Sequence, residues 1–428
     1  MLETQRGSVT IRRLLYAISV VGVVISSADL LPDVDLSTLW ESLTRRASGD
    51  ANCASVTATR WSMARRGRDP PANFITGAFD SWELPAIDPM NGTGGEQWEF
   101  DGVSGDGQSA FVFGFYRDPN YSFLGTGNLR AYAEFVFSDG SRYAVVDYAE
   151  KATLEACSGG SRGVWEGAGF RYEFVLSEDL RHASIVMDSK EVQVRIAMDS
   201  VAPPRYADNS AWRSPAGSAL SVPHFYWVEP VPAANLNFDA VINGLAVSWS
   251  GMGSHERLWG AFNWYTCLAS LVAVKFQAGP YALSLLDLGS GVQDGLHVAS
   301  ILLSKDGRKV FATRRTEQSA GLEDYMDVRK TYGGPGATTA HLEDEVTGVE
   351  VLLHSPSQGR SWSFRISHVK VLFEYVLGEG LGGTAYSGTV QGGLSGSQES
   401  WTGPAFTEIM RMPRNSWLLA KNYPKGEL

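Results

Sequence analysis

Histidine, cysteine and charged residues are scarce in this chain of 428 residues. The seven histidines are scattered and none lies at metal-ligand spacing from another, so we expect no metal site. Lysine and arginine (36) are outnumbered by aspartate and glutamate (47), and no basic stripe occurs, which argues against a nucleic-acid-binding protein. With 44% hydrophobic and only 19% charged residues, the composition excludes a disordered or coiled-coil chain.

Long apolar runs are also few, and the one at the N-terminus predicts a targeting segment. Arg12 and Arg13 precede the apolar run 14–25, which small residues follow up to Ala28. This pattern is typical of a signal segment over residues 1–28, and it places the protein in the secretory pathway, secreted or lumenal. The run is shorter than the roughly 20 residues that span a bilayer. An uncleaved anchor is the alternative, and it would be the chain's only contact with a membrane.

Three cysteines are an odd number for an oxidising compartment. Cys267 lies in an apolar run, so we expect it to be a buried free thiol. Cys53 and Cys157 are then the candidate disulfide. Two sequons, at Asn91 and Asn120, predict N-glycosylation.

What the chain has in abundance is glycine and aromatic residues. The 46 Gly, 13 Trp, 16 Tyr and 19 Phe are typical of a β protein whose aromatic side chains face a core or an apolar cavity. Short alternating runs separated by turns, among them Asn243-Gly244, predict an all-β chain of two consecutive barrels or sandwiches. We expect an arm over 29–71, an N-terminal β domain over 72–205, a linker over 206–230 and a C-terminal β-barrel domain over 231–428. Residues 258–268 are the best candidate for a short helix.

Two glycine-rich motifs resemble known sites without their structural context. Residues 159–163 match a nucleophile elbow, which needs a strand before and a helix after it. Residues 378–383 match a dinucleotide fingerprint, but no βαβ unit surrounds them. We interpret both as loops of a β protein, and we expect no cofactor.

Two other stretches crowd acids among aromatic residues: Phe79–Leu84 and Gly251–Trp264. In the second, Glu256 has two interpretations. It forms a buried salt bridge with Arg257 or another arginine and anchors one domain on the other. Alternatively, its pKa is raised beside indole rings and it donates a proton.

At these stretches the sequence resembles the fungal lipocalin-like Diels-Alderases, which are distantly similar to carotenoid 1,2-hydratases. The stretches that carry the resemblance are Ser81-Trp82-Glu83, residues 226–231, residues 253–259 and residues 278–281, and their order extends over most of residues 72–412. The resemblance implies two lipocalin-like β domains with a pocket at or near their interface, no cofactor, and a [4+2] cycloaddition on a hydrophobic polyketide- or terpene-derived substrate. The signal segment favours the hetero-Diels-Alder branch, in which two separate molecules are joined.

By this resemblance Glu83 faces the pocket, and Glu256, with His255, matches the His-acid stretch of the hydratases, so we expect these three to be catalytic. Strand position and composition add aromatic candidates for the pocket wall: Trp82, Tyr116, Trp227, Trp264, Trp362 and Tyr386. A pericyclase is the leading hypothesis. The alternatives are a hydratase or cyclase in which Glu256 protonates an alkene, and a non-catalytic lipid carrier.

Overall fold

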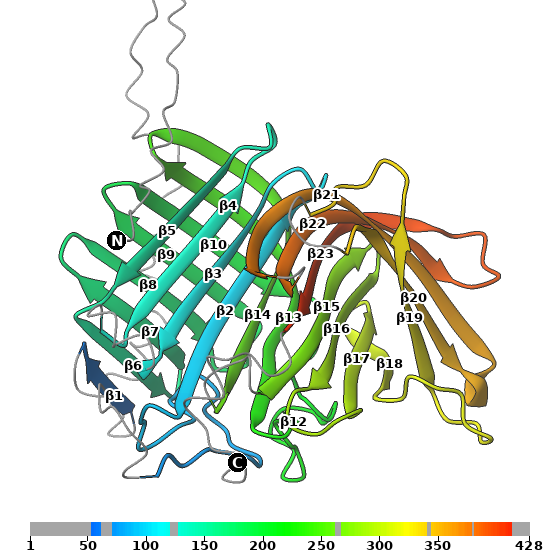
Figure 1. The fold of residues 1–428 in the computed structure, drawn as a ribbon, viewed down its shortest axis with the longest axis horizontal. Coiled ribbons are helices and arrows are strands. Elements are labelled where there is room, and N and C mark those ends of the chain that lie inside the picture. The colour runs from blue at the N-terminus through cyan, green and yellow to red at the C-terminus, as the bar shows by residue number, and fades with distance from the viewer. Residues whose placement is uncertain are drawn as a thin grey trace, which may run out of the picture. The chain divides into compact units, whose positions relative to one another are not determined.

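The computed structural model describes residues 53–60, 71–119, 127–261, 267–339, 344–378 and 381–412. In these ranges nearly all regular structure is antiparallel strand, arranged in two curved sheets (Figure 1). The prediction of an all-β chain with two barrel-like units is confirmed. None of the helices in these ranges has the length and apolar character needed to cross a membrane.

The larger sheet contains fourteen strands. Along its edge-to-edge path the order is β1-β6-β7-β8-β9-β10-β13-β14-β2-β3-β4-β5, and β11 and β12 pair with β13. In chain order these strands are β1 (Ala54–Thr59), β2 (Gly94–Ser104), β3 (Ala110–Arg117), β4 (Arg130–Val136), β5 (Arg142–Tyr148), β6 (Lys151–Cys157), β7 (Gly160–Gly167), β8 (Phe170–Ser177), β9 (His182–Ser189), β10 (Val192–Ser200), β11 (Arg205–Tyr206), β12 (Leu220–Val222), β13 (Phe225–Ile242) and β14 (Leu245–Ala261).

The smaller sheet contains nine strands in the order β18-β17-β16-β15-β23-β22-β21-β20-β19. Its strands are β15 (Leu268–Ala278), β16 (Tyr281–Ser290), β17 (His297–Lys305), β18 (Arg308–Thr313), β19 (Tyr325–Tyr332), β20 (Val346–Ser355), β21 (Arg360–Gly378), β22 (Leu381–Leu394) and β23 (Trp401–Arg411), with a 3-10 helix at Pro356–Gln358.

The boundary between the sheets differs from the predicted linker at 206–230. That stretch contains the end of β11, all of β12 and the beginning of β13. The hairpin of β13 and β14 completes the larger sheet by pairing with β10 and β2. The chain changes sheet between Ala261 and Leu268, so the predicted second domain begins too early. The helix expected over 258–268 is also wrong at its ends, because Leu258 belongs to β14 and Leu268 to β15.

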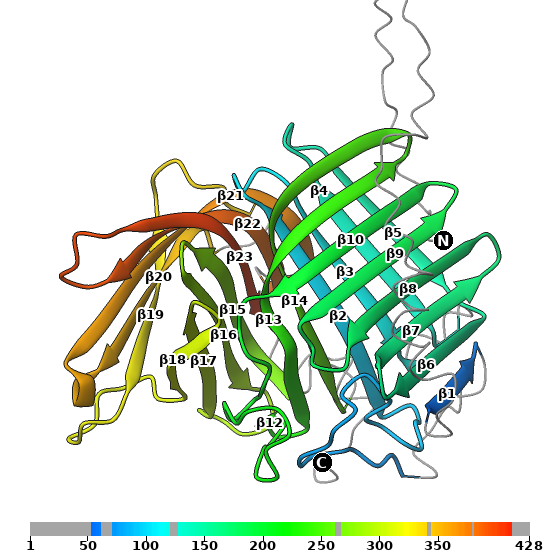
Figure 2. The same cartoon turned by 180° about the vertical axis from the view of Figure 1, so that it is seen from behind.

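The two sheets meet along β13, β14 and β2 on one side and β15, β16 and β23 on the other (Figures 1 and 2). Each sheet has an apolar core of its own, and further apolar clusters combine residues of both, for example Trp227 and Leu258 with Leu271 and Leu286. Strands at this junction are therefore covered on both faces. Any cavity between the sheets takes its walls from two consecutive parts of the chain.

Several local predictions are confirmed. Cys53 and Cys157 form a disulfide that links the edge strand β1 to β6, and Cys267 is a buried free thiol. Asn243 and Gly244 both have positive φ, 49° and 80°, as the two-residue turn between β13 and β14 requires. The loop predicted for residues 159–163 is wrong, because Ser161 lies in the antiparallel strand β7, but this setting does exclude a nucleophile elbow.

Candidate functional site

Strand β14 divides the residues of the predicted catalytic stretch between two faces. Successive side chains on a strand point to opposite faces. His255 stacks on Phe100 inside the larger sheet, with ring centroids 3.9 Å apart. Glu256 points toward the smaller sheet, where its Oε1 lies 3.5 Å from Nζ of Lys275. The two neighbours in sequence therefore act in different surroundings.

Glu83 and His255 form a buried pair within the larger sheet. Oε2 of Glu83 lies 3.1 Å from Nε2 of His255, and Nδ1 of His255 lies 2.8 Å from the carbonyl oxygen of Glu99. Oε1 of Glu83 has no hydrogen-bond partner among the described residues. Both side chains are buried in a packed interior, and neither lines the cavity described below.

The partner of Arg257 is Glu96, not Glu256. Nη2 of Arg257 lies 3.0 Å from Oε2 of Glu96, and Arg117 binds the other oxygen of the same carboxylate. The cation that approaches Glu256 is Lys275 of β15, which also lies 2.6 Å from Oδ2 of Asp101. The interpretation of Glu256 as part of an inter-sheet ion pair thus holds, with a lysine in place of an arginine.

A cavity of about 400 Å³ lies between the two sheets. This volume falls within the usual range for small-molecule pockets, roughly 300–1,000 Å³. The strands of the larger sheet contribute Gln97, Glu99, Val112, Tyr116, Arg130, Tyr132, Phe225, Glu256 and Leu258. The smaller sheet contributes Leu268, Leu271, Ala273, Leu286, Phe373, Tyr375, Glu408, Met410 and Met412. The walls are mostly apolar, and three of the polar side chains are carboxylic acids.

The strand register explains how two of these acids come together. Glu256 of β14 is paired with Glu99 of β2, and Glu99 with Gly114 of β3, so the three positions form one row across the sheet. At Gly114 a Cβ atom would lie 2.5 Å from the ring of Tyr116. The missing side chain therefore lets the Tyr116 ring lie flat beside the acids, where it borders the cavity.

The third acid, Glu408 of β23, faces this row from the smaller sheet. Burial is the main cause that raises the pKa of Glu408 to about 8, and the nearby carboxyl group of Glu256 is the second cause. Burial and the charges of Glu256 and Glu408 also hold the pKa of Glu99 well above its ordinary value. Three acids in one enclosed space cannot all ionise cheaply. The cavity therefore contains neutral carboxylic acid groups, which donate hydrogen bonds, near neutral pH.

Glu256 has the most fully defined contacts of the three. Burial raises its pKa, while the charge of Lys275 and a hydrogen bond from Trp227 act in the opposite direction. Nε1 of Trp227 donates to Oε2 of Glu256 over 2.8 Å. This hydrogen bond from Trp227 holds one carboxyl oxygen in place and so fixes the orientation of the Glu256 carboxyl group toward the cavity.

The predicted aromatic wall is only partly assembled. Tyr116 lines the cavity, and Trp227 lies behind Glu256. Trp82 packs in the core of the larger sheet against Tyr206, and Trp362 in the core of the smaller sheet against Phe311. Tyr386 stacks on His368, also away from the cavity. Trp264 lies outside the described residues.

The glycosylation predictions have different outcomes. Asn91 is fully buried, and its Oδ1 accepts hydrogen bonds from the backbone N and the hydroxyl of Thr93. The expectation of a glycan there is contradicted, because a buried amide cannot carry one in the folded chain. Asn120, and the signal segment over 1–28, lie outside the described residues.

Glu99 and Glu408 are the functional candidates that the sequence analysis missed. Both are acidic residues beside large apolar residues in the sequence: Glu99 lies between Trp98 and Phe100, and Glu408 precedes Ile409 and Met410. An acid at an inward position of a strand is a usable signal, but the strand over 94–104 was not predicted. Tyr132, Arg130 and Tyr375, which also line the cavity, had no signal in the sequence beyond their residue type.

Comparison with known proteins gives one consistent family. A family model described as Diels-Alderase-like matches residues 57–413. The chain is 44% identical over 369 residues to Diels-Alderase cheD of Chaetomium globosum, and the matched region covers 85% of this chain and 86% of that protein. It is 43% identical over 393 residues to Diels-Alderase ffsF of Aspergillus flavipes, covering 91% and 94%. The crystal structure of CghA with Sch210972 has a similar fold, with a TM-score of 0.70 and 22% identity over 85% of this chain and 100% of that one.

Proposed function

This chain belongs to the Diels-Alderase-like family, and we propose that it carries out its [4+2] cycloaddition in the cavity between the two sheets. The observation that supports this site is the meeting of an apolar enclosure with neutral carboxylic acids. The substrate we propose is a hydrophobic molecule derived from a polyketide or a terpene. It is held against Phe225, Leu271 and Leu286 while its reacting ends face the acids.

The first contribution to the rate is the folded pose of the substrate. A cycloaddition forms two bonds between diene and dienophile in one step and needs no nucleophile. Holding both in contact converts much of the entropic barrier into binding, which in favourable cases is worth about 7–11 kcal/mol. The shape of the cavity then selects the product, since a difference of about 1.4 kcal/mol between two poses gives a tenfold preference.

The second contribution is a hydrogen bond from Glu256. In its protonated form, which burial favours, Glu256 donates to a carbonyl oxygen on the electron-poor partner, where negative charge develops in the transition state. Trp227 keeps the carboxyl group oriented, and the surrounding apolar walls keep water from competing. No proton is transferred to carbon in this mechanism.

The test is turnover of a reactive linear precursor by the purified protein in buffered D₂O, against boiled protein. We expect a faster reaction, a changed diastereomer ratio and no deuterium on carbon. Glu256→Ala should lose about 100-fold in rate, as loss of one oriented donor does elsewhere, and Glu256→Gln, which keeps an N–H donor, less. Glu178→Gln, at a side chain that is 60% exposed, is the matched control.

Other results would support the alternatives. Deuterium on carbon would indicate a hydratase or cyclase that protonates an alkene. Tight binding with an unchanged rate and diastereomer ratio would indicate a carrier. Kinetics that depend on two separate substrates would identify a hetero-Diels-Alder or other intermolecular reaction, and first-order kinetics an intramolecular one.

We also propose that the protein enters the secretory pathway. The N-terminal segment 1–28 and the disulfide between Cys53 and Cys157 support this, because disulfides persist mainly in oxidising compartments. Expression in a fungal host, followed by N-terminal sequencing, should give a mature chain that begins after Ala28. A chain that retains its N-terminus in the reducing cytosol would contradict it.

A further inference from the structure

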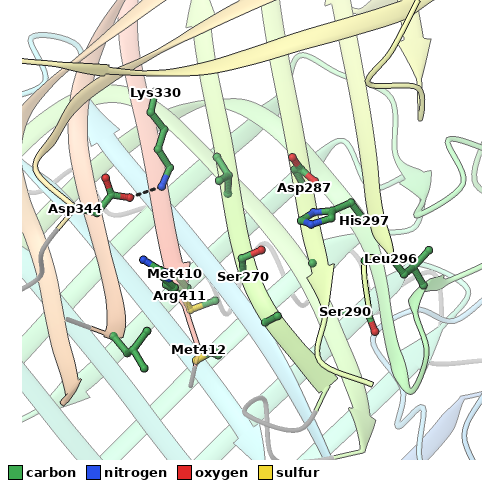
Figure 3. Close-up of a pocket in the computed structure, with 15 residues that line it drawn as sticks. Ser270, Asp287, Ser290, Leu296, His297, Lys330, Asp344, Met410, Arg411 and Met412 are labelled. Carbon is green, nitrogen blue, oxygen red and sulfur yellow. Dashed lines mark hydrogen bonds and ion pairs between the residues drawn. The ribbon is translucent and has the colours of Figure 1, made fainter. Parts of the chain in front are cut away.

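A second chamber, of about 720 Å³, opens at one end of the smaller sheet (Figure 3). It lies on the face of β15 and β16 that carries the apolar core of this sheet. On β15 the residues of this face change from Phe276 and Val274 in the core to Ser270 in the chamber. On β16 they change from Leu285 to Asp287. The apolar core thus ends in a polar space.

Three polar side chains of the chamber stand in one row across four strands. Arg411 of β23 is paired with Ser270 of β15, Ser270 with Gly289 of β16, and Gly289 with His297 of β17. With neighbouring strands about 4.8 Å apart, this row is roughly 14 Å long. Figure 3 shows Ser270 between Arg411 on one side and Asp287 and His297 on the other.

Gly289 makes the middle of this row accessible. A Cβ atom at this position would lie 2.4 Å from Oγ of Ser270 and 3.1 Å from Cε1 of His297. Any side chain here would therefore push against both polar groups. The space above Gly289 is the place where a ligand would contact Ser270 and His297 together.

The polar groups of the row, and Asp287 beside it, have no hydrogen-bond partner in the part of the chain that the structure describes. Among the described residues, the side chains of Ser270, Asp287, His297 and Arg411 form no hydrogen bond, and Oδ1 of Asp287 is buried. Lys330 and Asp344, the other charged residues of the chamber, neutralise each other as an ion pair. Within the described ranges, Arg411 is thus a solvent-exposed cation without an acid partner at one end. At the other end, the partly buried Asp287 lies near His297, which is also exposed.

We propose that this chamber binds a small carboxylic acid that also carries a hydrogen-bond donor. The planar guanidinium group of Arg411 matches a carboxylate with two parallel hydrogen bonds, and the hydroxyl of Ser270 adds a third donor beside it. Asp287 accepts from the donor group at the far end. This site is distinct from the cavity between the sheets, although Met410 and Met412 border both.

The probe for the experiment is dansylglycine, which carries a carboxylate and a sulfonamide N–H, with dansylamide as the analogue that lacks the carboxylate. We expect the full-length protein to enhance dansylglycine fluorescence and to bind it at least tenfold more tightly than dansylamide. Arg411→Gln should remove this preference. Arg365→Gln, at a side chain that is 70% exposed on β21, should leave it unchanged.

Two further variants locate the probe. Gly289→Val adds no charge but fills the space between Ser270 and His297, so it should weaken binding about tenfold or more. Glu256→Gln changes the other cavity and should leave binding unchanged. Equal affinity for the two probes, or binding that is insensitive to Arg411→Gln, would overturn the proposal. Loss of binding in Glu256→Gln would also overturn it, because the probe would then occupy the cavity between the sheets.

Discussion

Glu256 of β14 lies directly opposite Glu99 of β2, on the face of the larger sheet that borders the cavity. Like charges at directly paired strand positions are unfavourable, and burial adds to the cost. The pair is tolerated because its members need not ionise together and because Lys275 approaches Glu256 from the other sheet. The acids of the cavity therefore titrate as one coupled group.

The first prediction concerns stability and pH through Glu408. Its pKa in the folded chain is about 8, against an ordinary value of 4.5, so the folded chain keeps this proton to higher pH than the unfolded chain. The contribution of Glu408 to stability should therefore be greatest below about pH 4.5 and should be lost as the pH rises through 8. In Glu408→Gln this part of the decline should be absent.

Thermal unfolding between pH 5 and 9 measures this difference. The variant should gain in melting temperature relative to wild type as the pH increases. Glu178→Gln, on the protein surface, should follow the wild type throughout. Parallel curves for wild type and Glu408→Gln would show that Glu408 titrates normally.

The second prediction is a shift of the pH–rate profile in Trp227→Phe. The indole donates a hydrogen bond that favours the charged form of Glu256 and so lowers its pKa. Without this donor the pKa of Glu256 rises and the neutral acid persists to higher pH. The fall in rate on the alkaline side should move to higher pH.

Trp259→Phe is the matched control for this measurement. Nε1 of Trp259 donates to the carbonyl oxygen of Ile75, on the other face of β14, so its loss should not move the profile. A profile that moves to lower pH in Trp227→Phe, or stays in place, would count against Glu256 as the neutral donor.

The fold was more accessible from the sequence than the site. Strand β10, which has one buried face, shows the period of two that predicts it. Strand β2 was harder to predict, because both its faces are covered although Gln97, Glu99 and Asp101 on one of them are polar. The resemblance to the Diels-Alderase family, predicted from short stretches around Glu83 and Glu256, is confirmed.

The site depends on which positions pair between strands far apart in the chain. Glu99 meets Glu256 only through the pairing of β2 with β14, and Glu408 approaches them only from the second sheet. No spacing in the sequence contains this information. The same limit explains why His255 and Glu256, adjacent in sequence, were grouped although they face opposite sides of one strand.

The third prediction separates a structural role of Glu83 from a catalytic one. Glu83→Ala leaves Nε2 of the buried His255 without its partner, which should cost about 1–3 kcal/mol of stability. Because Glu83 does not line the cavity, the diastereomer ratio of the product should be unchanged. Denaturant unfolding and product analysis of the same preparation test both statements. An altered ratio at unchanged fold would restore Glu83 and His255 as catalytic residues.

The fourth prediction concerns Lys275, the cation that joins the sheets. In Lys275→Met the carboxylate of Asp101 stays buried, and among the described residues the hydroxyl of Ser254, 2.6 Å from Oδ2, is its one remaining side-chain donor. Breaking one member of a buried ion pair typically costs about 3–5 kcal/mol. Lys151→Met, at a surface pair with Glu166, should cost less than about 1 kcal/mol.

The double variant Lys275→Met with Asp101→Asn decides whether this loss comes from the stranded charge. Since asparagine carries no charge, the double variant should be more stable than Lys275→Met alone. The two residues are in contact, so the effects of the two substitutions should not add. The fall in rate on the alkaline side should also move to higher pH in Lys275→Met, because Lys275 lowers the pKa of Glu256, Glu99 and Glu408. If the double variant were less stable than the single one, Lys275 would contribute mainly through packing between the sheets, and the charge balance proposed for the cavity would be wrong.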